Sequence, residues 1–276
     1  MSDDLTTALA TAAEWPADNV AVAVVDAEGR VRATHGNQDR GYRLASVTKP
    51  LSAYALLVAV EEGALDLDQA AGPEGATVRH LLAHTAGYDF DSRTVRGAPG
   101  ARRLYSNAGF AMLGELLHAE TGIPFGEYAR EAVFDPLGMT ATAITGSPGA
   151  GGHSTASDLS RFAAELQRPA LLAPETLAEA TSVAFPGLRG VLPGFGRQDP
   201  NDWGLGFEIR DGKSPHWTGT RNSPATFGHF GQSGTFLWVD PAAHLALVAL
   251  TDRDFGPWAA EAWPPFSDAV LAAARV

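Results

Sequence analysis

Apolar positions follow strand-like patterns near both ends of this chain. A run of β-branched residues at 20–25, the turn residues 26–29 and the alternating residues 30–34 together predict a β-hairpin. Four further apolar segments predict strands towards the other end, at 204–209, 227–231, 235–239 and 245–251. Their short connections favour an antiparallel meander over parallel βαβ units, and we expect the hairpin to join the same sheet.

In the middle of the chain, apolar residues recur every three or four positions, as they do on one face of a helix. Helices are therefore predicted at 47–62, 77–84, 108–120, 128–134 and 157–166, with outlying helices at 3–14 and 266–274. The stretch from 168 to 202 is rich in Pro and Gly, so we expect it to be a loop that forms the rim of a pocket.

These patterns predict an α+β fold. An antiparallel sheet built from both chain ends, about residues 1–50 and 200–276, would be flanked by helices, and a mainly helical part, about residues 51–199, would be inserted between its halves. Length alone allows one large domain or two small ones. The composition is globular, because 45% of the 276 residues are apolar and 19% are charged.

Charge and composition exclude several classes of function. The net charge of −12 argues against a nucleic-acid partner or an anionic membrane surface, since both require a basic footprint. The absence of cysteine excludes disulfides and thiolate chemistry. The acidic N-terminus is not a secretory signal, and no run of 18 apolar residues predicts a membrane span. We therefore expect a soluble cytoplasmic protein, and the sequence leaves its oligomeric state open.

Two familiar chemical motifs are present only in part. His80 and His84 share a helix face, but Leu81 stands where a zinc protease requires Glu, so we expect no metal site. The segment 152–156 matches a nucleophile elbow around Ser154, but the Gly- and Pro-rich residues before it cannot form the buried strand that an elbow requires. We expect structural roles for these residues.

A third motif, Ser46-Val47-Thr48-Lys49, begins the apolar helix at 47–62. Serine and lysine three residues apart lie on the same helix face, and the helix N-terminus favours a serine alkoxide. A lysine in an apolar site can lose its proton near neutral pH and act as a base. Lysine is scarce here, since Lys49 and Lys213 are the only two, so a chance placement is less probable. The alternative is a capping serine followed by an exposed lysine.

Tyr105 and Asn107 lie between a polar loop and the next predicted helix. Tyr105 could exchange a proton with Ser46 if a cationic lysine lowers its pKa. Asn107 could accept a hydrogen bond from Lys49 and donate one to a substrate carbonyl. The alternative is a tyrosine packed at a helix entry with Asn107 as its cap.

His229-Phe230-Gly231 lies on a predicted strand, where alternation places His229 and Gly231 on the same face. A glycine at this position would let a substrate backbone approach closely. The alternative is an ordinary strand glycine beside a surface histidine.

Taken in order, these three pairs resemble the signature of the serine β-lactamase and penicillin-binding-protein superfamily. The branch they resemble is the class C β-lactamase-related group, which contains esterases, D-aminopeptidases and DD-peptidases. The resemblance extends over roughly residues 18–275 and implies a single β-lactamase/transpeptidase-like catalytic domain over residues 1–276. Flanking segments similar to that group are Leu81–Gly87, Phe134–Met139, Ser154–Leu159, Trp203–Phe207 and Gly228–Thr235.

This resemblance implies an acyl-enzyme mechanism without a cofactor. Ser46 would be the nucleophile, and Lys49 would be its base or would hold Tyr105 as the phenolate that acts as base. Tyr105 would protonate the leaving group and activate water for deacylation, and Asn107 would orient the acyl side chain. The backbone N–H groups of Ser46 and Gln232 would form the oxyanion hole.

The sequence departs from true β-lactamases at 229–231, where those enzymes have Lys-Thr-Gly or Lys-Ser-Gly. With His229 in place of the lysine, the strand lacks a fixed cation for a β-lactam carboxylate. We therefore expect a serine hydrolase that acts on a small-molecule acyl substrate, most plausibly an esterase of broad specificity. The alternatives are a weak β-lactamase, a D-amino-acid peptidase or DD-carboxypeptidase, and a non-catalytic penicillin-binding-like protein.

Overall fold

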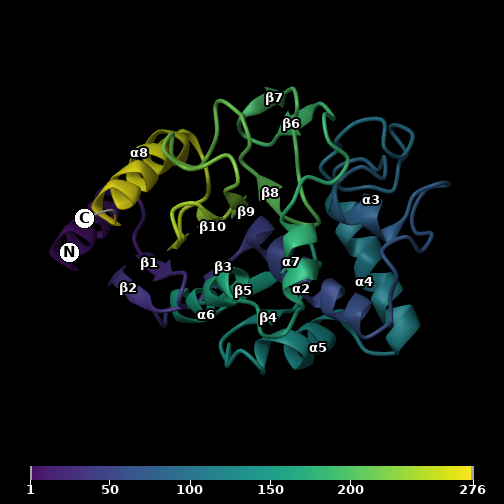
Figure 1. The fold of residues 1–276 in the computed structure, drawn as a ribbon, viewed down its shortest axis with the longest axis horizontal. Coiled ribbons are helices and arrows are strands. Elements are labelled where there is room, and N and C mark those ends of the chain that lie inside the picture. The colour runs from purple at the N-terminus through teal and green to yellow at the C-terminus, as the bar shows by residue number, and fades with distance from the viewer. Residues whose placement is uncertain (1, 275–276) are drawn as a thin grey trace.

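A computed structural model describes residues 2–274, and its largest element is a six-stranded antiparallel sheet (Figure 1). The strand order is β2-β1-β11-β10-β9-β8, so strands from both chain ends lie side by side at its centre. The strands are β1 (Val20–Asp26), β2 (Val31–His35), β8 (Glu208–Ile209), β9 (Phe227–Gly231), β10 (Thr235–Asp240) and β11 (Leu245–Thr251). The predicted hairpin and meander are confirmed.

The sheet separates two hydrophobic cores, and strand β1 shows how. Its residues point alternately to opposite faces. Ala21, Ala23 and Val25 pack in the core shared with the helical region, whereas Val22 and Val24 pack in the core under the terminal helices. Because both faces of β1 are covered, the strand is a nearly continuous apolar run. The terminal helices are α1 (Ser2–Ala10), continued by a 3-10 turn (Thr11–Glu14), and α8 (Pro257–Ala274).

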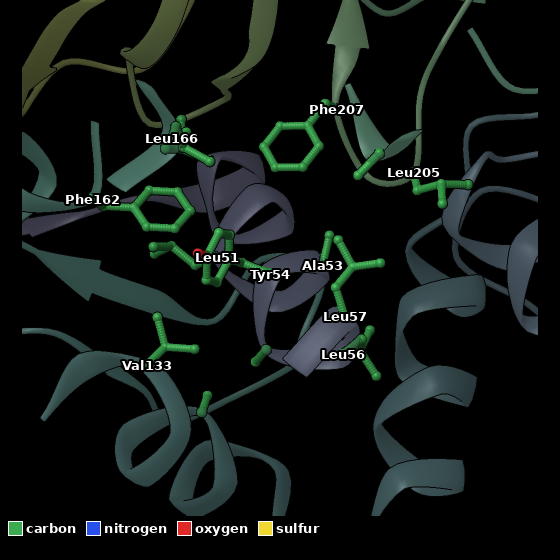
Figure 2. Close-up of a cluster of buried hydrophobic side chains, with 14 of the residues drawn as sticks. Leu51, Ala53, Tyr54, Leu56, Leu57, Val133, Phe162, Leu166, Leu205 and Phe207 are labelled. Carbon is green, nitrogen blue, oxygen red and sulfur yellow. The ribbon is translucent and has the colours of Figure 1, made fainter. Parts of the chain in front are cut away.

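The other core surrounds helix α2 (Thr48–Glu61), which is buried for nearly its whole length. Figure 2 shows its side chains between Phe162 and Phe207 on one side and Val133 on another. The surrounding helices are α3 (Val78–Leu82), α4 (Asn107–Thr121), α5 (Phe125–Ala129) with a π-helical turn (Arg130–Phe134), α6 (Ala156–Gln167) and α7 (Pro174–Ala180). A fully buried helix at the centre explains why 47–62 reads as apolar on all sides.

Several elements differ from the sequence prediction. Helix α8 begins at Pro257 rather than at 266, and it contains Pro264 and Pro265. Strand β8 is only two residues long, because Gly206 has a φ of 82° and bends the chain over α2. The stretch 168–202 contains helix α7 and a hairpin. Short strands that the pattern does not predict are β3 (Tyr42–Arg43), β4 (Ala143–Ile144), β5 (Gly152–Ser154), β6 (Gly190–Leu192) and β7 (Gly196–Gln198).

Within residues 2–274, no helix combines the length and the apolar character that crossing a bilayer requires.

Candidate active site

Ser46 lies immediately before helix α2, in a 3-10 turn at Ala45–Val47. Ala45 has a φ of 45°, a left-handed conformation that costs a non-glycine residue on the order of 1 kcal/mol. Strand β9 packs closely against this turn, and a Cβ added at Gly231 would lie 2.2 Å from the Leu44 carbonyl oxygen. Gly231 therefore admits the protein's own backbone, whereas the sequence analysis expected it to admit a substrate.

The Lys49 amine contacts oxygen atoms of uncharged groups. Its side chain is fully buried, one helical turn after Ser46. The Nζ atom donates to Asn107 Oδ1 at 2.6 Å and to the Gly149 carbonyl oxygen at 2.8 Å. It also lies 3.4 Å from Ser46 Oγ. The structure thus brings the predicted serine, lysine and asparagine together.

Burial without a counter-charge controls the protonation of Lys49. No carboxylate of the described chain, residues 2–274, lies within 4.0 Å of its amine. Burial lowers the pKa of the amine from 10.5 to about 7, and the attraction of Asp91 opposes this only in part. A neutral amine has two N–H bonds, which match the two close acceptors. Its lone pair is then free to face the Ser46 hydroxyl.

Tyr105 lies against both Lys49 and His229. The Lys49 Nζ atom is 4.6 Å from the centre of the tyrosine ring. The phenol oxygen is 3.3 Å from His229 Nε2. Burial raises the pKa of Tyr105 above the ordinary phenol range, although a hydrogen bond with Ser46 works in the opposite direction. Tyr105 therefore keeps its proton, which favours the lysine rather than a phenolate as the proton acceptor.

His229 is a buried neutral imidazole. Burial and the nearby Lys49 lower its pKa to about 3. Its Nδ1 atom lies 2.6 Å from the Phe230 carbonyl oxygen, which can only accept, so we assign the proton to Nδ1. Nε2 is then an acceptor for the Tyr105 hydroxyl. Burial thus removes the partial positive charge that an exposed histidine carries at neutral pH.

Asn107 is the first residue of helix α4 and not its cap. Ser106 is the cap, since its hydroxyl accepts from the Gly109 N–H at 3.1 Å. The Asn107 carboxamide is engaged on both sides, accepting from Lys49 and donating to Asp91 Oδ1 at 2.8 Å. Asn107 therefore positions the lysine, and orientation of an acyl group by the same amide remains a prediction.

The two expected oxyanion donors, the N–H groups of Ser46 and Gln232, belong to residues that line one small pocket. Phe255 anchors the Gln232 turn: its N–H donates to the Gln232 carbonyl at 2.7 Å, and its carbonyl accepts from Gln232 Nε2 at 3.2 Å. Within the described chain, the Gln232 N–H donates no hydrogen bond. This donor therefore remains available.

The small pocket has a volume of about 70 Å³. A cavity of this size has room for a group of only a few heavy atoms. Its lining is mostly aromatic and apolar, and consists of Ser46, Phe90, Tyr105, Leu192, Pro193, Trp203, Glu208, His229, Phe230 and Gln232.

Three contributors to the site were missed from the sequence. Gly149 offers only its backbone carbonyl, which no side-chain pattern reveals. Phe90 stacks on Tyr105 with ring centroids 5.7 Å apart, and its position in a polar loop gave no signal. Glu208 lines the small pocket from the two-residue strand β8.

Glu208 belongs to a second buried polar group. Lys213 Nζ lies 2.5 Å from its carboxylate, and Trp217 Nε1 and His216 Nε2 contact the other oxygen at 3.0 and 2.9 Å. These partners outweigh burial and lower the pKa of Glu208 to about 2. The carboxylate beside the pocket is thus ionised and fully partnered.

The residues of the two incomplete motifs make contacts that stabilise the fold. His84 is buried, and its Nδ1 accepts from the Ser106 N–H at 3.2 Å, which ties the end of α3 to the start of α4. His80 is partly buried and contacts Thr77 Oγ1 at 2.9 Å. Ser154 lies in the short strand β5, with its hydroxyl 2.7 Å from that of Thr142.

Comparison with known proteins assigns this arrangement to a family. Residues 12–272 match the Beta-lactamase family model. The chain therefore belongs to the Beta-lactamase family, whose members are serine hydrolases, and its fold is the α+β fold of that family.

Individual relatives differ in their described activities. The chain is 57% identical to a crystal structure of a β-lactamase from Mycobacterium bovis, with a TM-score of 0.96 over 98% of this chain and 100% of that one. A 24% identical protein of Escherichia coli O157:H7 is named "Putative D-alanyl-D-alanine carboxypeptidase"; the match covers 82% of this chain and 71% of the relative. The fold also matches EstCE1, a hydrolase with promiscuous acyltransferase activity, at 19% identity and a TM-score of 0.78 over 98% of each chain.

Proposed function

We propose that this protein hydrolyses small carboxylic esters through an acyl-enzyme on Ser46. The observation that carries the proposal is the Lys49 amine, which is buried without a carboxylate partner and lies 3.4 Å from Ser46 Oγ. Such an amine is a base matched to neutral pH, the condition under which general base catalysis is most effective.

In the acylation step, Ser46 Oγ attacks the substrate carbonyl while its proton passes to Lys49 Nζ. The N–H groups of Ser46 and Gln232 stabilise the resulting oxyanion, and each such donor contributes about 10²–10³ in rate. When the tetrahedral intermediate collapses, Tyr105 gives its proton to the leaving oxygen. The Lys49 ammonium then returns a proton to Tyr105. The product of the acylation step is an ester of Ser46.

In the deacylation step, water attacks the Ser46 ester and its proton passes to the Lys49 amine. Collapse of the second tetrahedral intermediate returns that proton to Ser46 Oγ. In the resting enzyme the neutral His229 accepts the Tyr105 hydrogen bond, so it holds the phenol in place as a positioning residue.

Two features support an ester preference. The small pocket suits a short acyl group. Strand β9 carries the neutral His229 where β-lactamases carry a lysine, so it offers no cation to a β-lactam carboxylate. The names of the M. bovis and E. coli relatives make β-lactam hydrolysis and D-alanyl peptide hydrolysis the rival activities. A cytoplasmic location and a lack of nucleic-acid or membrane partners stay predictions.

The test is turnover of p-nitrophenyl acetate by the wild type and by Ser46→Ala and Lys49→Ala. We expect both variants to lose at least about 10³-fold in kcat/KM. Ser154→Ala is the matched control, because Ser154 is the other serine with a motif-like setting, and it should keep its rate within a few-fold. Near-wild-type activity of Ser46→Ala would overturn the mechanism.

Parallel assays separate the rival activities. Nitrocefin and a D-alanyl-D-alanine peptide are compared with the ester by kcat/KM, and mass spectrometry follows the acyl adduct on Ser46. We expect the ester to be the best substrate. A higher kcat/KM for nitrocefin or for the peptide would replace the proposed activity. Failure of a fluorophosphonate probe to label Ser46 in folded protein would indicate a non-catalytic binding protein.

A further inference from the structure

Beside the small pocket lies a much larger cleft that the mechanism above does not use. Its volume is about 670 Å³, within the range of ordinary ligand sites. Phe90, Tyr105 and Pro193 line both cavities, so the cleft and the small pocket share part of their walls. Its wall comes from the loop before α4 and from the β6–β7 hairpin, which lie side by side near the top of Figure 1.

The cleft is strongly basic in an acidic protein. Five arginines line it, together with only two aspartates, whereas the whole chain has a net charge of −12. The arginines are Arg96, Arg102, Arg103, Arg189 and Arg197, and the aspartates are Asp89 and Asp199. A concentration of one sign of charge in a concave surface raises the local concentration of ligands of the opposite sign.

Two of the five arginines have structural partners. Arg96 pairs with Asp89 at 2.8 Å. Arg103 is buried and donates to the carbonyl groups of residues 83, 184, 185 and 201. Burial lowers the pKa of Arg103 to about 10, so it stays cationic at neutral pH, and its charge is offset by the Asp202 carboxylate 3.8 Å away.

The other three arginines are available to a ligand. Arg102, Arg189 and Arg197 are exposed, and no carboxylate of the described residues lies within 4.0 Å of their guanidinium groups. Arg102 makes one hydrogen bond, to the Arg96 carbonyl oxygen at 2.9 Å. Guanidinium groups bind carboxylates and phosphates through paired hydrogen bonds, which makes this cleft an oxyanion-binding surface.

Backbone hydrogen bonding holds Arg103 and Arg189 beside each other. The Arg103 N–H donates to the Arg189 carbonyl oxygen at 3.0 Å, and Arg103 pairs with Gly190 in a parallel bridge. A Cβ at Gly190 would lie 2.6 Å from the Arg103 carbonyl oxygen, so only glycine allows this approach. Arg197 comes from the opposite strand of the hairpin, where it pairs with Val191.

We propose that the arginine-lined cleft binds the leaving group of the substrate, and that this group carries a carboxylate or a phosphate. The inference rests on the proposed function. Tyr105, the proton donor to the leaving oxygen, lines both cavities, so a group that departs from it has the cleft beside it while the acyl group occupies the small pocket. The substrate class is therefore a short-chain acyl ester of an anionic alcohol or phenol.

The test compares three acetate esters: phenyl acetate, p-acetoxybenzoate and p-acetoxyphenyl phosphate. Each kcat/KM is divided by the rate of spontaneous hydrolysis, which removes the effect of leaving-group acidity. We expect an advantage of about tenfold or more for an anionic ester over the neutral one, which declines as NaCl is raised to 1 M because salt screens exposed charges. Comparison of the two anionic esters distinguishes carboxylate from phosphate.

The variant Arg189→Gln/Arg197→Gln should lose most of this advantage. The readout is the corrected kcat/KM for an anionic ester divided by that for the neutral ester. A general loss of folded protein lowers both values equally and leaves the ratio unchanged. Arg168→Gln is the matched control, since Arg168 is exposed, has no ion pair in the described chain and lies at the end of α6 outside the cleft. The control should keep the wild-type ratio.

Failure of this inference is distinguishable from failure of the proposed function. Hydrolysis of all three esters with equal corrected rates, or an advantage that survives the double substitution, overturns the cleft assignment and leaves the esterase intact. If no ester is hydrolysed, calorimetric titration of Ser46→Ala with p-hydroxybenzoate, phenyl phosphate and phenol still tests the cleft. Binding of the anions that the double substitution abolishes supports the assignment, and equal or absent binding overturns it.

Discussion

Lys49 and Lys213 are the only lysines in the chain, and both are buried, yet they have opposite surroundings. Lys213 contacts the ionised carboxylate of Glu208 at 2.5 Å. Lys49 contacts amide and carbonyl oxygens and a hydroxyl. A buried lysine beside a counter-charge is a structural ion pair, whereas one without a counter-charge releases its proton and becomes a base.

The difference also explains why these two positions are lysine in a chain that otherwise prefers arginine. Arginine supplies 18 of its 20 basic residues. A guanidinium stays protonated in proteins, so it cannot be a base, and its planar shape does not fit a compact site with acceptors around a single nitrogen. The comparison predicts that substitutions at the two lysines affect rate and stability in opposite ways.

The largest expected effect is on catalysis. Lys49→Met should lower kcat/KM for p-nitrophenyl acetate by about 10³- to 10⁴-fold, because it removes the general base. Lys49→Arg should be equally inactive, since it restores charge but not the ability to accept a proton. Steady-state kinetics measures both. Substantial activity in the arginine variant would show that position 49 contributes only positive charge.

The next largest effect is on stability. Lys213→Met should lower the free energy of unfolding by about 3–5 kcal/mol, because it leaves the buried Glu208 carboxylate without its lysine and with only the His216 and Trp217 contacts. Urea denaturation measures the change. Adding Glu208→Gln removes the unpaired charge and should recover part of the loss. If Lys213→Met is neutral, the contrast between the two lysines is wrong.

The pH dependence of the wild type should follow Lys49. The base must be unprotonated, and its pKa is about 7, so kcat/KM should rise with pH and level off above 7. Between pH 5 and pH 7 the expected increase is roughly 50-fold, and it reaches roughly 100-fold at the plateau, the behaviour of a single ionisation. A profile that is flat from pH 5 to 9, or that rises only above pH 9, would mean that Lys49 is not the titrating base.

The smallest expected effect is a gain in the free energy of unfolding from a substitution in the core, where substitutions usually lower it. In the unfolded chain the Lys49 amine keeps its proton up to pH 10.5, whereas in the folded chain it loses it near 7, so folding is penalised most below pH 7. Lys49→Met removes this penalty but leaves the acceptors of Asn107 and Gly149 without a donor. We expect a net gain of about 2 kcal/mol at pH 6.

The pH dependence of that gain provides its control. Above pH 7 the folded chain holds fewer protons than the unfolded chain, so wild-type stability rises with pH and the advantage of Lys49→Met should shrink towards pH 10. Denaturation of both proteins at pH 6 and pH 9 tests this. An advantage that grows with pH would contradict the assignment of the lowered pKa to Lys49.

The fold could be predicted from the sequence where burial is uniform. The strands at 20–25 and 245–251 and the helix at 47–62 are continuous apolar runs, and the structure places them at the centre of the cores. The hairpin formed by β6 and β7 could not be predicted, because its three-residue strands each begin with a glycine and are stabilised by contacts with the distant Arg103. The first half of α8 was not predicted, because Pro264 and Pro265 lie inside the helix and proline is rare at such positions.

The candidate site, like the fold, could be predicted from the sequence only in part. Motif spacing identified the side chains that gather around Lys49, including Ser46, Tyr105 and Asn107. It could not identify the Gly149 carbonyl, because every residue has one, or the neutrality of His229, because that depends on burial. The arginine-lined cleft combines residues from two segments almost a hundred positions apart, so only the folded chain reveals it.

The most direct test of the central claim is the titration of Lys49 itself. With only two lysines, protein labelled with ¹³C at lysine Cε gives two lysine signals by NMR, and the one absent from Lys49→Met belongs to Lys49. We predict that its chemical shift titrates with a midpoint near pH 7. A midpoint close to the ordinary lysine value of 10.5 would contradict the assignment of Lys49 as the neutral base for Ser46.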